Sequence, residues 1–210
     1  GRAARALTTA ASALTLAVGA LTLAPAPAHA DDAVPSQEYF SYYYLDSARE
    51  KGYTGKGVTI ALIAGPVDTS DPALQGASIT DKSRCTIEAS PSEARHSTDM
   101  AIILVSPITG VAPDATLYTY QTGTEESKSG GSCDSPDGRQ LDTYGNLINQ
   151  AVDDGAQIIS VSQSVFDGSA QLKWAIAHAL SKGVLIVASA GNSSSSNENT
   201  THLGRWSGVI

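Results

Sequence analysis

Short apolar runs alternate with helical patterns over residues 55–210, and this alternation predicts the fold. Val58–Ala64 is apolar at almost every position, which is typical of a parallel strand that is buried on both faces. Similar runs predict strands at Ala115–Gln121 and Gln157–Val161, and another buried strand at Val184–Ala190.

Helical patterns fill the intervals between these runs. A polar start with Asp99 in the first turn, followed by apolar residues, predicts a helix over Ser97–Val105. Leu147–Val152 lies in a second predicted helix, and apolar residues at helical spacing predict a third over Ala170–Ser181. Strands and helices that alternate in this way form βαβ units. The sequence therefore predicts an α/β fold, a three-layer doubly wound parallel sheet.

Residues 1–30 read as a secretory signal peptide. Arg2 and Arg5 precede an apolar run at Ala6–Ala24, and Ala28–Ala30 has small residues at both key positions of a cleavage site. A membrane anchor is the alternative, because the run is about long enough to span a bilayer. The Ala- and Thr-rich composition and the cleavage site favour the signal peptide and hence a secreted protein.

Two polar segments are expected at the surface. Residues 31–54 are rich in tyrosine and predict a surface strap that packs aromatic rings on the domain of residues 55–210. Residues 122–140 are rich in Gly, Ser and Asp and predict an exposed loop. The tyrosines of the strap that suggest this packing are Tyr39, Tyr42, Tyr43 and Tyr44.

Charge narrows the choice of partner. Arg2 and Arg5 are the only charged residues before Ala30, so cleavage there leaves 11 basic and 21 acidic residues, a net charge of −10 compared with −8 for the whole chain. An acidic surface argues against nucleic acid or an anionic membrane as a partner of the mature form. We expect a monomer with no cofactor. Calcium stays open, because no segment has a clear ligand spacing.

Cys85 and Cys133 are the only cysteines of the chain. In an exported protein a disulfide is expected, and two free thiols are the alternative. The bond would close a loop of 48 residues. Such a loop contributes about 4 kcal/mol in the chain-entropy description.

The predicted topology also indicates where a ligand would bind. In open parallel sheets, ligands bind outside the carboxyl ends of the strands. This rule selects Ala64 at the end of the first strand, Asn192 after the last, and His96 at a helix start that faces the same edge.

Segments near these three positions resemble the subtilisin family of serine peptidases. His96–Ala101 resembles the H-G-T-x-V-A segment of that family, and the other segments occur in the family's order. The others are Gly55–Ile63 with Val67–Ser70, Gly110–Ala115, Ile158–Ser162 and Val187–Asn192.

The resemblance implies peptide-bond hydrolysis by acyl transfer on a polypeptide substrate. His96 occupies the position of the general base, and Asn192 that of the side-chain donor of the oxyanion hole. The strand that lines the substrate cleft in this family corresponds to Ser160, Val161, Ser162 and Gln163.

Two residues depart from the family pattern. Ala64 stands in the position of the aspartate that orients the histidine in the family, and the side chain of alanine cannot accept a hydrogen bond. Asp68 is a poor replacement, because the family commonly has an aspartate there as well. Ser97 stands where the family has glycine directly after the histidine.

The family's nucleophilic serine lies in a G-T-S-x-A-x-P segment, and nothing in the printed sequence matches it. Ser169 opens a predicted helix and is best explained as its N-cap. We expect a secreted endopeptidase that is present as a fragment lacking the C-terminal part of its domain and is inactive as printed. A secreted pseudopeptidase that retains a peptide-binding cleft is the alternative, and a non-functional reading frame is a third option.

Overall fold

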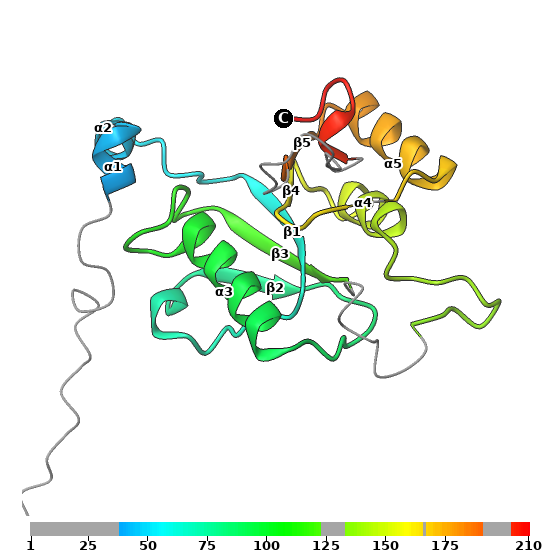
Figure 1. The fold of residues 1–210 in the computed structure, drawn as a ribbon. Helices are drawn as coiled ribbons and strands as arrows, with labels where there is room; N and C mark the ends of the chain where they lie inside the picture. The colour runs from blue at the N-terminus through cyan, green and yellow to red at the C-terminus, as the bar shows by residue number, and fades with distance from the viewer. Residues whose placement is uncertain (1–37, 123–132, 166, 191–202) are drawn as a thin grey trace, which may run out of the picture.

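The computed structural model describes residues 38–122, 133–165, 167–190 and 203–210. Within them, five parallel strands form one sheet in the order β2-β3-β1-β4-β5 (Figure 1). The strands are β1 (Thr59–Ala64), β2 (Ser78–Asp81), β3 (Thr116–Gln121), β4 (Ile158–Val161) and β5 (Leu185–Ala188). The predicted signal peptide at residues 1–30 lies outside the described residues.

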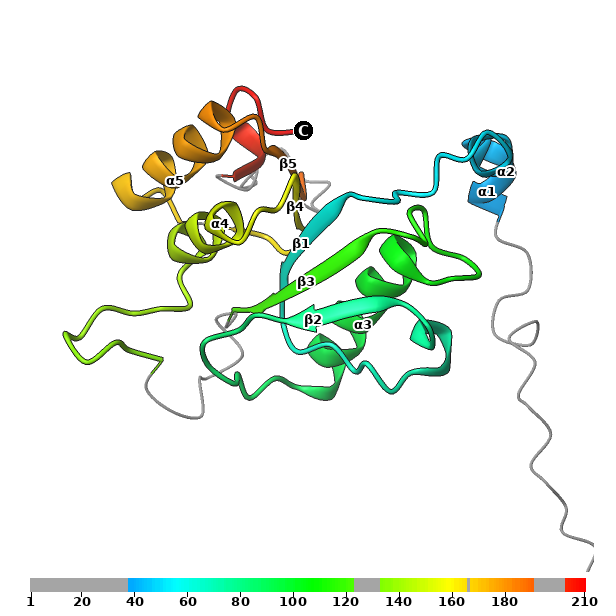
Figure 2. The ribbon, with the colours of Figure 1, turned by 180° about the vertical axis from the view of Figure 1, so that it is seen from behind.

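Helices cover both faces of the sheet (Figures 1 and 2). α3 (Pro91–Val105) packs on one face, and α4 (Tyr144–Asp153) and α5 (Ala170–Ser181) pack together on the other. The predicted α/β fold with three layers is therefore confirmed. The short elements are α1 (Glu38–Tyr42), α2 (Leu45–Glu50), η2 (Pro72–Leu74) and η3 (Leu203–Arg205).

β1 is buried on both faces because it lies in the middle of the sheet, between β3 and β4. Ile60, Leu62 and Ala64 face α3, while Ala61 and Ile63 face the α4–α5 side. The crossover through α3 and the crossover through α4 cover opposite faces. The carboxyl end of β1 is therefore at the topological switch point, where doubly wound sheets bind their ligands.

The prediction that the first helix starts near Ser97 was wrong, because α3 begins at Pro91. Ser90 caps it, with its hydroxyl accepting from the Glu93 N–H, while the Glu93 carboxylate accepts from the Ser90 N–H. This capping box satisfies two backbone donors, the N–H groups of Ser90 and Glu93, and fixes the helix start. His96 consequently lies in the second turn.

Two strands differ from expectation. β2 was missed because its sequence, Ser-Ile-Thr-Asp, is polar and it lies at an exposed edge of the sheet. The prediction of a fully buried strand at Val184–Ala190 was wrong, because β5 spans Leu185–Ala188 and only one of its faces is buried. Leu185 and Val187 are exposed on the same side of the sheet as α3, which packs on β1 and β3.

The strap contains helices α1 and α2, and it does not pack its tyrosines as expected. The Tyr39 hydroxyl donates to the Thr109 carbonyl at 2.7 Å. The Arg49 guanidinium donates to the carbonyls of Ile108 and Gly110. The remaining tyrosines of the group, Tyr42, Tyr43 and Tyr44, have exposed rings. Two long polar side chains therefore attach this segment. None of the helices in the described residues is long and apolar enough to cross a membrane.

Cys85 and Cys133 are joined by a disulfide, with Cα atoms 5.7 Å apart. The bond connects the segment before α3 to the segment before α4, and both segments follow carboxyl ends of strands. The expectation that residues 122–140 are an exposed loop was wrong at two positions, since Thr122 and Cys133 are buried. Residues 123–132 lie outside the described part.

Candidate functional site

The carboxyl end of β1 is packed against α3 and has no acidic side chain. Ala64 is 1% exposed and belongs to the apolar cluster that contains Leu62 and Ala101. Its carbonyl oxygen accepts a hydrogen bond from the Thr122 N–H at 2.8 Å. The position at which the resemblance expects an aspartate is therefore a closely packed apolar one.

Gly65 and Ser97 fit one another at this point. Ser97 is fully buried, and its hydroxyl donates to the Glu93 carbonyl at 2.9 Å, within the helix. A Cβ atom placed on Gly65 would lie 3.0 Å from the Ser97 Oγ, which is closer than such atoms normally approach. At Gly65 the space between this end of β1 and α3 is thus taken by the Ser97 side chain, which comes from the helix.

His96 precedes Ser97 in α3, and its side chain is exposed. Because Ser97 contacts Gly65, the structure brings positions 64 and 96 to the same edge of the sheet, as the sequence predicted. Among the described residues, no hydrogen bond or ion pair holds the His96 imidazole. The ring is therefore available to solvent and has no orienting partner in this part of the chain.

Asp68 does not fill the place of the missing acid. Its carboxylate accepts from the Ser70 N–H at 2.9 Å and from the Ser70 hydroxyl at 2.5 Å. These hydrogen bonds hold the pKa of Asp68 below its usual range. Its own N–H donates to the Thr98 Oγ1 at 3.0 Å, which ties this turn to α3. The sequence analysis gave Thr98 no role, although Thr98 lies in the His96–Ala101 segment.

The strand end at β4 differs from that at β1, because it is polar and partly open. Val161 is buried, while Ser160, Ser162 and Gln163 are half-buried. The Gln163 Oε1 accepts from the Tyr144 hydroxyl at 3.1 Å. Burial raises the pKa of Tyr144 to about 12. This end offers hydroxyl and amide groups to a ligand.

A buried polar pair next to this end was not predicted. The Thr122 hydroxyl donates to the Asp142 carbonyl at 2.9 Å. Asp142 is 7% exposed, and its Oδ1 has no hydrogen-bond partner among the described residues. Both residues lie in or beside the polar segment that was expected to be exposed. The sequence contained one sign that the chain is ordered here. Thr143, directly after Asp142, is a typical N-cap residue and caps α4.

The remaining expected residues have different outcomes. Asn192 lies outside the described residues. Ser169 caps α5 as expected, and its hydroxyl accepts from the Leu172 N–H at 3.1 Å. Within the described ranges, no group of three or more His, Cys, Asp or Glu side chains is placed to hold a metal ion.

Comparison with known proteins identifies the family. The sequence model of the subtilase family matches residues 55–206. The chain belongs to the subtilase family. The major intracellular serine protease of Bacillus subtilis (strain 168) is 31% identical over 163 residues, covering 73% of this chain and 48% of the relative. Subtilisin E of the same strain is 30% identical over 156 residues, covering 72% of this chain and 38% of the relative.

Solved structures show the same relationship. The prenylagaramide maturation protease PagA superposes with a TM-score of 0.54 at 27% identity, covering 70% of this chain and 50% of that one. The PatG macrocyclase in complex with peptide gives a TM-score of 0.57 at 17% identity, covering 87% of this chain and 62% of that one, and it supports the fold alone. The chain spans about half the length, or less, of these two curated relatives.

Proposed function

We propose that the protein is a secreted subtilase that binds polypeptide in the family's cleft and hydrolyses it extremely slowly or not at all. The observation that carries this proposal is Ala64, a buried alanine in the position of the orienting acid. Loss of that acid alone lowers kcat about 10⁴-fold in subtilisin. The signal-peptide pattern of residues 1–30 supports secretion.

In this proposal His96 occupies the position of the general base but lacks its partner. A carboxylate normally holds the imidazole in one tautomer and stabilises the imidazolium that forms during acyl transfer. Ala64 can do neither. Gly65 and Ser97 support this loss, because a side chain at position 65, next to the position of the acid, would meet the Ser97 hydroxyl.

The proposed peptide-binding part is the end of β4 and the residues after it. Ser160, Ser162 and Gln163 present polar groups at the sheet edge where ligands of this fold class bind. We place the ligand here because the residues after Val161 lie beyond the register that pairs β4 with β1 and β5, and the backbone of an extended peptide can pair with such a segment. We propose a monomeric protein that needs no cofactor, and calcium binding stays open.

A secreted serine endopeptidase is the second candidate. It is favoured by His96 and Thr98, which keep the family's residue types in the histidine segment. It would require a nucleophilic serine in a G-T-S-x-A-x-P segment, which residues 1–210 do not contain. It would also require a carboxylate from another part of the protein that accepts a hydrogen bond from the His96 imidazole and orients it.

Labelling and binding measurements on the same chain separate the two candidates. We expect no covalent labelling by a fluorophosphonate probe, and saturable binding of unfolded casein peptides measured by fluorescence anisotropy. Gln163→Trp should weaken this binding about tenfold by filling the open strand end. Gln171→Trp is the matched control, since Gln171 also makes one side-chain hydrogen bond but lies exposed on α5.

Clear labelling together with peptide cleavage would establish the endopeptidase and end the proposal of lost hydrolysis. Absence of both labelling and peptide binding would reject both candidates. Equal weakening by Gln163→Trp and Gln171→Trp would place the peptide somewhere other than the end of β4.

A further inference from the structure

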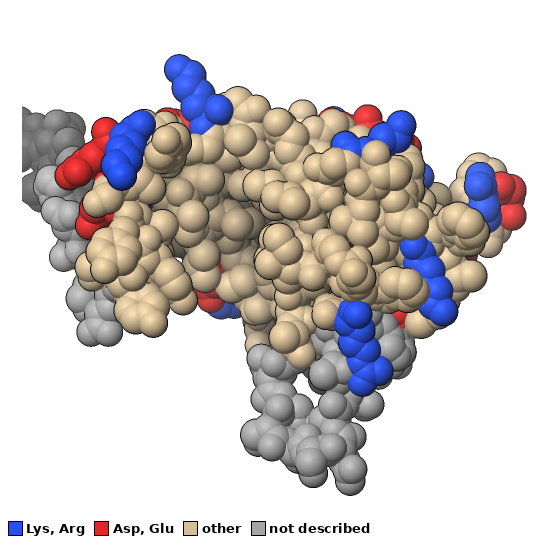
Figure 3. Space-filling model, turned by 90° about the horizontal axis from the view of Figure 1, so that it is seen from above, with Lys and Arg blue, Asp and Glu red and all other residues tan. Residues whose placement is uncertain are grey.

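Residues 133–141, here called the hairpin, lie directly before α4 and stand out from the domain. The hairpin is closed at its base, where the Leu141 N–H donates to the Cys133 carbonyl at 2.7 Å. Its tip is exposed and holds an ion pair, with the Arg139 Nε 2.8 Å from the Asp137 Oδ2. The hairpin forms the right-hand edge of the molecule in Figures 1 and 3, and basic and acidic side chains meet on it in Figure 3.

The disulfide fastens the base of this hairpin to the sheet. Cys133 is 6% exposed, and its partner Cys85 lies in a loop that is fixed to the end of β3. Gln121, the last residue of β3, makes this attachment on both sides of Cys85. Its Oε1 accepts from the Ile87 N–H at 3.0 Å, and its N–H donates to the Ser83 Oγ at 2.9 Å. The disulfide therefore connects the hairpin to a part of the chain that β3 holds in place.

Hydrogen bonds lead from the end of the hairpin to the proposed peptide-binding residues. Asp142 is buried directly after the hairpin, and its carbonyl accepts from the Thr122 hydroxyl at 2.9 Å. The Thr122 side chain also forms a hydrogen bond with the Tyr144 hydroxyl. That hydroxyl donates to the Gln163 Oε1 at 3.1 Å. A contiguous set of contacts thus joins the hairpin to the end of β4, as energetic coupling between two places requires.

Reduction of the disulfide would release the hairpin from this attachment. A thiolate of a dithiol attacks one sulfur, the bond between Cys85 and Cys133 breaks, and the dithiol closes to its own disulfide as two cysteine thiols form. A loop of 48 residues then opens, and the chain that leads into α4 loses a covalent constraint. Because Tyr144 is the first residue of α4, its hold on Gln163 would weaken.

We propose that the disulfide between Cys85 and Cys133 controls peptide binding at the end of β4, so that the oxidised chain binds and the reduced chain binds weakly. This inference rests on the proposed function, because it requires a peptide at that strand end. Tyr144 is a positioning residue in this account, since it acts on the peptide through Gln163. Cys85 is half-buried, which gives a small thiol access to the bond.

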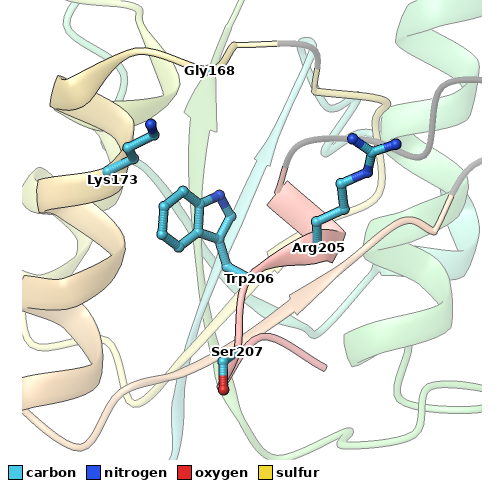
Figure 4. Close-up of a pocket in the computed structure, with 5 residues that line it drawn as sticks. All are labelled: Gly168, Lys173, Arg205, Trp206 and Ser207. Atoms are coloured by element: carbon cyan, nitrogen blue, oxygen red, sulfur yellow. The ribbon is translucent and has the colours of Figure 1, made fainter.

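A pocket elsewhere in the domain provides a contrasting place for a peptide. This pocket of about 460 Å³ lies between α5 and η3, and Lys173 and Trp206 are among the residues that line it (Figure 4). Of the described residues, none from the hairpin lines it. A peptide that binds in this pocket should therefore keep its affinity when the disulfide is reduced.

The test measures binding of a cysteine-free casein peptide by fluorescence anisotropy, with and without dithiothreitol. We expect the reduced chain to bind about tenfold more weakly than the oxidised chain. The double variant Cys85→Ser, Cys133→Ser should bind as weakly as the reduced chain and should not respond to dithiothreitol. Thiol titration establishes the redox state of each sample, and circular dichroism establishes that it is folded.

Thr122→Val tests the same path while the disulfide stays intact. It removes the hydroxyl that joins Asp142 to Tyr144 and should weaken peptide binding by the oxidised chain about fivefold. Thr119→Val is the matched control, because the buried Thr119 hydroxyl lies in the same strand but donates to Asp81 of β2. This control should change peptide binding by less than about twofold.

Three results would overturn the inference and leave the proposed function standing. These are equal peptide binding by folded oxidised and reduced chains, a response of the double variant to dithiothreitol, and equal weakening by Thr119→Val and Thr122→Val. If the reduced chain does not fold, the two threonine variants decide the question in the oxidised state. Absence of binding by the oxidised unmodified chain would instead reject the proposed peptide binding itself.

Discussion

The carboxyl ends of β1 and β4 are neighbours in one sheet, yet they differ in packing and polarity. The end of β1, here called the closed end, consists of Ala64 and Gly65 packed against Ser97, and all three are buried. The end of β4, here called the open end, consists of the half-buried Ser162 and Gln163. The closed end is packed against α3, whereas the open end presents polar groups at the edge of the sheet.

In the proposed function, this difference allows a subtilase domain to lose its chemistry and keep its binding surface. The two tasks depend on different strands, so a change at the closed end leaves the open end untouched. The hydrogen-bonding needs of the closed end are met within α3, because the buried Ser97 hydroxyl donates to the Glu93 carbonyl of its own helix. Nothing at that point requires a carboxylate from β1.

The largest effect is expected from the disulfide, which connects the segment before α3 to the segment before α4. Replacing both Cys85 and Cys133 with serine opens a loop of 48 residues. The free energy of unfolding should fall by about 4 kcal/mol in the chain-entropy description. Urea denaturation of the oxidised chain and of the double variant measures this. A loss below about 1 kcal/mol would show that the two segments are held together by their other contacts.

Ala64→Asp is expected to be the next most damaging change. It would bury a carboxylate at a position that is 1% exposed, in an apolar cluster, and should lower the free energy of unfolding by about 3 kcal/mol. Ser162→Asp is the matched change at the open end and should cost about 1 kcal/mol or less. Thermal and urea denaturation of both variants compare them. Equal losses would contradict the division into a closed and an open end.

Gly65→Ser tests the fit between β1 and α3. The new side chain would lie against the Ser97 Oγ, so we expect a loss of about 1–3 kcal/mol. In a chain that also carries Ser97→Gly, the same change should cost less, with a coupling energy of at least about 0.5 kcal/mol. The double-mutant cycle in urea measures this coupling. Strict additivity would mean that the two positions do not compete for space.

The sheet could be predicted from the sequence where burial alone decides structure. The continuous apolar run of β1 reflects its central position between two layers of helices. β2 gives no such signal, because an exposed edge strand can be polar. The start of α3 could have been predicted as well, since Ser90 and Glu93 form a recognisable S-x-x-E capping box. The change from polar to apolar residues at Ser97 obscured it.

The candidate site was predictable in position but not in detail. The carboxyl-edge rule and the order of the motifs place Ala64 and His96 at one edge. The fit of Gly65 to Ser97 depends on a distance of 3.0 Å between residues 32 positions apart, which no pattern in the sequence reports. The same holds for Asp142, whose burial depends on its contact with Thr122.

The smallest effect is expected from Tyr144→Phe, and it appears at alkaline pH. The pKa of Tyr144 is raised from 10.0 to about 12, chiefly by burial, so between these values the folded chain keeps a proton that the unfolded chain has lost. This contribution to stability is complete below pH 10 and is lost as the pH rises toward about 12. Tyr144→Phe should therefore reduce the fall in stability between about pH 10 and pH 11. At neutral pH it should cost about 1 kcal/mol, for the lost hydrogen bond to Gln163.

Urea denaturation at a series of pH values measures this slope, with Tyr43→Phe as the matched control because that ring is exposed. The comparison defines how far the open end extends into the domain. A reduced slope in Tyr144→Phe means that water stops at Gln163 and that the hydroxyl beneath it belongs to the protein interior. An unchanged slope would contradict the burial of the Tyr144 hydroxyl and would mean that water already reaches it.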